Sequence, residues 1–141
     1  MNRLNQRTYI IITQGAILVS LAVIIGAFGA HGLKPHLTAY QLDIFETGNR
    51  YHFYHGLGVL ALAPLANYLS ANKLKITVTL LILGVLLFSG SLYLLATREL
   101  LGITNWKFLG PLTPIGGVFF IIGWSYLGWT TLHAKKNHEQ S

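Results

Sequence analysis

The sequence contains no cysteine and few charged residues, and both shortages restrict what the protein can be. Without cysteine there is no disulfide, no thiolate nucleophile and no cysteine-ligated iron–sulfur cluster. Only 10% of the 141 residues are Asp, Glu, Lys or Arg, whereas about one quarter of the residues in ordinary soluble domains are charged. Because 52% of the residues are hydrophobic, the composition indicates an integral membrane protein.

The basic residues are scattered along the chain. Ten Lys and Arg residues give a formal net charge of +6. They stand between apolar runs and do not form the basic stripe that is typical of nucleic-acid binding. We therefore expect no nucleic-acid partner, and we interpret these residues as signals of membrane topology.

Four long apolar segments contain no Asp, Glu, Lys or Arg: 9–30, 53–69, 76–97 and 112–132. A helix needs about 20 residues to cross a hydrocarbon core of about 30 Å, and the second segment reaches this length only if it begins near Arg50. The first segment is longer than the apolar core of a secretory signal, about 7 to 15 residues, so we expect it to be retained. The sequence predicts an all-α integral membrane protein, with a single domain over 1–141 and spans at about 9–31, 50–70, 76–97 and 112–132.

A short amphipathic helix on the membrane surface is predicted between the first two spans of this four-helix bundle. Thr38 and Gln41 form a capping-box pattern, which marks the start of a helix. Apolar residues recur at helical spacing over the next turns, before the chain turns into the membrane near Thr47 and Gly48. The alternative is one continuous helix over 38–69.

A polar cluster, ETGNRYHFYH at 46–55, stands at the start of the predicted second span. Polar groups are costly inside a membrane, so such residues are candidates for a functional site. In an antiparallel bundle the end of the first span and the end of the third span lie on the same, outer side. We predict a candidate polar site there that comprises eight residues: His31, Glu46, Asn49, Arg50, His52, His55, Ser89 and Ser91.

Helical spacing divides the cluster into two groups. Glu46, Asn49 and Arg50 share one arc, and the spacing of Glu46 and Arg50 suits an ion pair, which we interpret as a structural latch. His52 and His55 lie on another arc and have the chemistry to bind a metal or relay protons. A zinc site needs three or four ligands, and the sequence offers no further cluster beyond His31. We therefore expect no metal and no cofactor, and we favour hydrogen-bonded structural histidines.

Motifs of known enzymes are absent from the sequence. Ser89 and Ser91 lack a nucleophile-elbow pattern, and neither an H-E-x-x-H motif nor a glycine-rich phosphate loop is present. We expect a non-enzymatic protein, and a membrane enzyme or haem binder is the third alternative.

The distribution of Lys and Arg predicts the orientation in the membrane. In a four-span protein, six of them lie on the side of the two termini and four on the other side. Because basic residues concentrate on the cytoplasmic side, we expect both termini to be cytoplasmic.

Four motifs carry a resemblance to a known family: GAFGAHG at 26–32, FETGNRYHFYH at 45–55, FSGSLY at 88–93 and GPLTPIGG at 110–117. They resemble the domain-of-unknown-function family numbered 423, over nearly the whole chain. The resemblance implies a small, four-span protein of the bacterial inner membrane. It implies no biochemical activity and no catalytic or binding residues.

Two functions remain open. The first is a structural or complex-associated membrane protein that binds the lipid bilayer and associates with further copies of itself or with a larger membrane complex. Small residues spaced four apart, Ala22, Gly26 and Ala30, favour close helix packing of this kind. The alternative is an oligomeric component that transports protons, ions or a small solute through the outer polar site.

Overall fold

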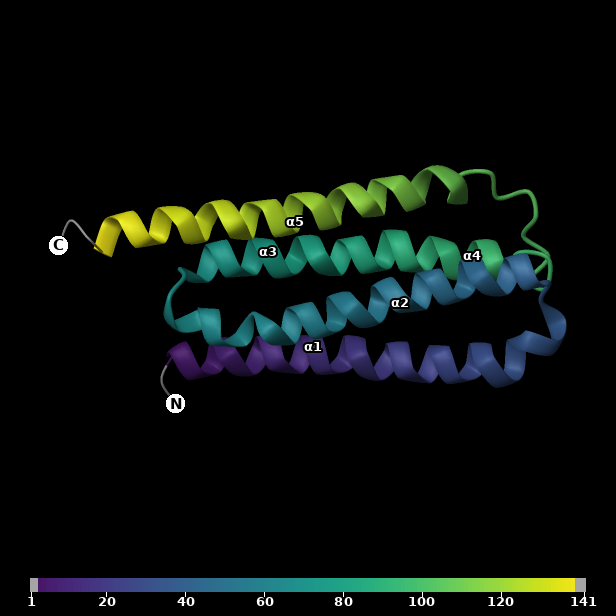
Figure 1. The fold of residues 1–141 in the computed structure, drawn as a ribbon, viewed down its shortest axis with the longest axis horizontal. Coiled ribbons are helices and arrows are strands. Elements are labelled where there is room, and N and C mark those ends of the chain that lie inside the picture. Colours follow the sequence, from purple (N-terminus) through teal and green to yellow (C-terminus); the bar gives the residue numbers. More distant parts are fainter. Residues whose placement is uncertain (1–2, 139–141) are drawn as a thin grey trace.

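The computed structural model describes residues 3–138, which form an all-helical, antiparallel bundle (Figure 1). The first turn of α1, the connection before α3 and the last turns of α5 lie at one end, which we call the terminal end. The connections from α1 to α2 and from α4 to α5 lie at the opposite end, which we call the loop end.

The five α-helices are joined by short helical turns of other types. The α-helices are α1 (Arg3–Phe28), α2 (Ala39–Ala61), α3 (Ala71–Gly84), α4 (Gly90–Thr97) and α5 (Leu109–His138). A π-helical turn, η1 (Gly29–Leu33), and a 3-10 turn, η2 (Lys34–His36), follow α1. A second 3-10 turn, η3 (Ala63–Asn67), follows α2. A second π-helical turn, η4 (Val85–Ser89), joins α3 and α4 into one rod.

Three helical stretches are long and apolar enough to cross a membrane: Gln6–His36, Ala71–Thr97 and Leu109–His133. The predicted spans 9–31, 76–97 and 112–132 each fall within one of these stretches. The all-helical prediction is therefore confirmed, together with these three apolar helices.

The region of the predicted surface helix differs from the expectation. The capping box is present, with the Gln41 N–H donating to Thr38 Oγ1 at 3.3 Å and the Thr38 N–H donating to Gln41 Oε1 at 2.9 Å. However, α2 continues to Ala61 without a turn at Thr47 and Gly48. The structure thus has one long helix in place of a separate surface helix.

Two local features explain where α2 continues and where it ends. Gly48 lies against α4, and a Cβ atom added there would be 3.0 Å from the Cβ of Leu92. The missing side chain therefore serves close packing and does not end the helix. Pro64 lacks a backbone N–H and lies in η3, where the chain leaves the α-helical path. As a result α2 ends at Ala61, whereas the alternative of one continuous helix placed its end at residue 69.

Small residues bring α2 close to α1. Added Cβ atoms would lie 2.8 Å from the Leu60 backbone nitrogen at Gly15 and 3.0 Å from the Val19 nitrogen at Gly56. The predicted small-residue face is confirmed at Ala22, which is fully buried, and at Gly26, which lies against the Asn49 amide. Ala30 is exposed and lies outside this contact.

The helix α5 packs on the rod of α3, η4 and α4 in the same manner. Gly123 lies against Leu81, and Gly84 lies against the ring of Phe120. The apolar core fills the space between these helices and α2, with Val59, Leu81 and Phe120 among its buried members.

Substitution of Gly116 tests this packing. A Cβ atom there would meet the backbone nitrogen of Phe88 and lie 2.7 Å from its Cα. Because a backbone cannot rotate away as a side chain can, we expect Gly116→Ala to lower stability by about 1 to 3 kcal/mol, measured by thermal unfolding in detergent. Gly128→Ala is the matched control, since no described atom lies within 4 Å of its added Cβ. Equal unfolding temperatures of the two variants would contradict the close contact.

Candidate functional site

Three polar side chains meet between α2 and α4. The Tyr93 hydroxyl donates to Asn49 Oδ1 at 3.1 Å, and the Tyr93 hydroxyl oxygen lies 3.2 Å from His52 Nδ1. A tyrosine hydroxyl carries one hydrogen. Because Tyr93 donates this hydrogen to Asn49, the His52 Nδ1–H donates to the Tyr93 oxygen. This arrangement fixes the tautomer of His52 and leaves its Nε2 atom as a hydrogen-bond acceptor.

The backbone positions these groups through two glycines. Asn49 and His52 are three residues apart and share one face of α2. Gly48 allows α2 to approach α4, because an added Cβ would lie 3.3 Å from the Ser89 carbonyl oxygen. On the other side, the Asn49 amide lies against Gly26 of α1. The amide is therefore enclosed by three helices.

Two buried polar atoms beside this network have no hydrogen-bond partner among the described residues, His52 Nε2 and Ser89 Oγ. His52 is only 5% exposed and Ser89 is fully buried. They belong to α2 and η4, which contact each other at Gly48, one turn before His52. An unpaired buried polar group costs about 1 to 3 kcal/mol. Each of the two atoms is therefore free to form one further hydrogen bond.

The π-helical turn η4 ends at Ser89, so a backbone irregularity coincides with one of these two unpaired groups. Turns of this type are rare and occur often at functional sites. The other π-helical turn, η1, contains His31, which is exposed.

Ser91 has a different role from Ser89. Its hydroxyl donates to the Phe88 carbonyl at 2.9 Å and lies 2.7 Å from Thr113 Oγ1. Since Ser91 uses its hydrogen on Phe88, Thr113 donates to Ser91. This pair links α4 to α5, whereas Ser89 lies on the side of η4 that contacts α2.

His55 is packed among aromatic rings. Its Nδ1–H donates to the Tyr51 carbonyl at 2.8 Å. The imidazole stacks on Phe120, with ring centroids 3.5 Å apart and an interplanar angle of 13°. These contacts are those of a hydrogen-bonded, structural histidine.

The remaining predicted site residues lie outside the network. Glu46 and Arg50 are both exposed, and within the part of the chain that the structure describes neither forms the predicted ion pair. The ion-pair latch is therefore not formed. Of its three residues, Asn49 contacts Tyr93 of α4 and Gly26 of α1, whereas Glu46 and Arg50 are exposed on α2. His31 joins neither group.

Sequence reasoning missed Tyr93 and Thr113 as partners in this region. A tyrosine within an apolar span was a usable signal, because a buried phenol needs a hydrogen-bond partner. No group of three or more His, Asp or Glu side chains with metal-binding geometry is present among the described residues.

The apolar helices and the polar contacts enclosed between them define a helical membrane protein. The chain belongs to the family described as "Protein of unknown function (DUF423)", whose model matches residues 25–117. The matched region includes all eight predicted site residues and both Tyr93 and Thr113.

Bacterial relatives are similar to this chain over most of their length. The UPF0382 membrane protein YwdK of Bacillus subtilis is 44% identical over 116 residues, which are 82% of this chain and 89% of that protein. The UPF0382 membrane protein SSP2132 of Staphylococcus saprophyticus is 43% identical over 118 residues, which are 84% of this chain and 92% of the relative. No solved structure matches the chain.

Removal of the Tyr93 hydroxyl tests the network. In Tyr93→Phe, Asn49 Oδ1 and His52 Nδ1 each lose a partner, so we expect a loss of about 1 to 2 kcal/mol in stability, measured by thermal unfolding in detergent. Tyr54→Phe is the matched control, because Tyr54 lies on α2 and is 58% exposed. If the two variants unfold at the same temperature, the hydrogen bonds of Tyr93 do not stabilise the fold.

Proposed function

We propose that the protein is a non-enzymatic, four-span protein of the cytoplasmic membrane, whose structural role depends on association with further copies of itself through α1. The observation that carries this proposal is a second face of small residues on α1. Thr13, Ala16, Ser20 and Ala27 are all exposed. At about 100° per residue they fall within an arc of about 60°.

The small face of α1 is rotated by about 130° around the helix axis from the residues that contact α2. Gly15, Ala22 and Gly26 already pack inside the bundle. In a bilayer, small and hydroxyl-bearing residues allow two helices to approach closely. Large apolar side chains border the exposed small face, with Ile17 on one side and Val23 on the other, so a second α1 helix fits between them.

The proposal counts α2 as the fourth span. It has 23 residues, a length of about 35 Å at 1.5 Å per residue, and it lies along α1 in the bundle (Figure 1). Its polar residues Asn49, His52 and His55 make their contacts inside the protein. Low hydropathy of the whole helix is thus compatible with a surface toward lipid over 51–61, where the exposed residues are Tyr51, Tyr54, Leu57 and Ala61.

We place the outer membrane boundary at the level of Phe45, near the loop end. Phe45 lies against Gly29 at the end of α1 and has its ring centroid 4.9 Å from that of Tyr93 on α4. The first turns of α2, with Asp43, extend beyond this level. Arg50 lies about one turn inside it, where a long side chain reaches the headgroups by snorkelling.

We orient both termini toward the cytoplasm. Arg7, Lys73 and Lys75 lie at the terminal end, and the described acidic residues, Asp43, Glu46 and Glu99, lie at the loop end or its connections. Over the whole sequence six Lys and Arg residues belong to the terminal end and four to the loop end, which supports the orientation because basic residues favour the cytoplasmic side. Three further basic residues of the terminal end have side chains outside the described part of the structure: Arg3, Lys135 and Lys136.

Crosslinking tests self-association directly, because the chain has no native cysteine. We expect Ala16→Cys to form a disulfide-linked dimer in membranes under mild oxidation, since the two α1 helices would face each other there. Ser125→Cys is the matched control, an exposed small residue on α5, and should remain monomeric. Monomers alone, both in this assay and in native mass spectrometry from lipid discs, would contradict the proposal.

A second candidate function, transport of protons or a small polar solute, is favoured by the unpaired Nε2 atom of His52. If this atom carries the function, His52→Asn should abolish flux into liposomes, because Asn can donate to Tyr93 from the Nδ1 position but has no atom at the Nε2 position. His52→Gln retains a polar atom near that place and should keep part of the flux. Equal flux in wild type and His52→Asn, with both proteins folded, would exclude this role.

A further inference from the structure

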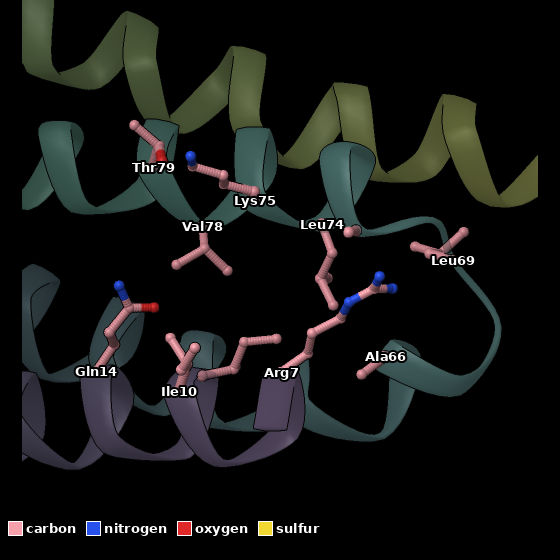
Figure 2. A pocket seen from close by; sticks show the side chains of 11 residues that line it. Arg7, Ile10, Gln14, Ala66, Leu69, Leu74, Lys75, Val78 and Thr79 are labelled. Carbon is pink, nitrogen blue, oxygen red and sulfur yellow. The ribbon is translucent and has the colours of Figure 1, made fainter. Parts of the chain in front are cut away.

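A cavity of about 340 Å³ opens at the terminal end, between α1, η3 and the start of α3. Figure 2 shows Arg7 and Gln14 extending from α1 toward α3, with Lys75 and Thr79 on the opposite wall. The rest of the lining is apolar and includes Ile10, Leu69 and Val78. The cavity lies at the other end of the bundle from Tyr93 and His52.

The charges at the cavity are not balanced by the protein. Arg7 and Lys75 come from different helices, and neither forms an ion pair with a described residue. The described carboxylates belong to the loop end of the bundle. Arg7 and Lys75 line the cavity from opposite walls, so an anion bound in it would be attracted by both.

Further hydrogen-bond donors border the cavity. Ala71 and Leu74, in the first turn of α3, line it. The first turn of α3 contains no acidic residue, and the side chain of Ser70 does not cap it. The backbone N–H groups there add positive potential, and Gln14 and Thr79 supply an amide and a hydroxyl. Each of these groups can donate a hydrogen bond to a phosphate oxygen.

The apolar part of the lining decides between ligands. Ile10 and Val78 line the cavity on α1 and α3, the two helices that border it within the apolar part of the bundle. A free inorganic phosphate makes no use of such a surface, whereas a phospholipid places its phosphate at the cations and its acyl chain along these residues. Basic pockets between transmembrane helices are typical sites for acidic lipid headgroups.

We propose that this cavity binds one anionic phospholipid, with its phosphate at Arg7 and Lys75 and an acyl chain between α1 and α3. The site is separate from the buried polar network and does not depend on self-association. It gives the terminal end a specific lipid ligand in addition to general contact with the bilayer.

Native mass spectrometry tests the site on the monomer. The full chain is released from bilayer discs that contain equal amounts of phosphatidylglycerol and phosphatidylcholine, and bound lipid is counted on the monomer peak. We expect retention of phosphatidylglycerol. The double variant R7Q and K75Q should weaken this retention roughly tenfold or more, because each basic residue near an acidic headgroup contributes about a fivefold preference.

The matched control removes two positive charges from the opposite end. K34Q with R98Q alters exposed cations at the loop end and should retain phosphatidylglycerol as wild type does. A third variant, Thr79→Trp, fills the cavity from its exposed rim and leaves both cations in place. It should expel the lipid, which tests the site even if the double variant folds poorly.

Three results would overturn the proposal. The first is equal retention of the two lipids by wild type. The second is retention by R7Q with K75Q equal to that of the loop-end control. The third concerns competition for the site by two soluble ligands, inorganic phosphate and dihexanoyl phosphatidylglycerol. If both displace the bound lipid at the same millimolar concentration, the two cations bind free phosphate and do not select a lipid.

Discussion

The structure depends on the close approach of α2 to its neighbours, and glycine makes that approach possible. Gly15, Gly26 and Gly56 form the contact with α1, and Gly48 forms the contact with α4. In a membrane, lipid is as apolar as the side chains it contacts, so helices associate through close packing and not through exclusion of water. The polar contacts of α2 are reachable only because the backbones come this close.

The position of α2 inside the bundle explains a discrepancy between its sequence and its environment. By hydropathy it is the least membrane-like of the long helices, and the three apolar stretches do not include it. Yet His52 and Asn49 direct their polar atoms toward Tyr93, and His55 stacks on Phe120. The neighbouring helices therefore provide the polar partners that lipid cannot provide.

The sequence predicts the elements of this fold better than their contacts. Lengths of apolar runs locate three helices, and Thr38 with Gln41 locates the start of α2, because both signals are local. From the sequence alone, Gly48 suggests a break in the helix. Its role in the close packing of α2 against α4 becomes visible only in the tertiary structure. The spacing of Glu46 and Arg50 permits an ion pair, but both side chains are exposed and do not pair with each other in the described structure. The contact from Tyr93 to Asn49 joins residues 44 apart in the sequence. It depends on the rotation of α2 about its own axis, which no local sequence pattern indicates.

The π-helical turn η4 sets the rotational phase of α4 relative to α3. A turn of this type contains one residue more than an α-helical turn in the same path, which changes the direction of each following side chain by about 100°. With a regular helix in place of η4, Tyr93 would no longer face Asn49, and Ser91 would no longer face Thr113. One backbone insertion therefore aligns two separate polar contacts, and the length of this segment matters as much as its residue types.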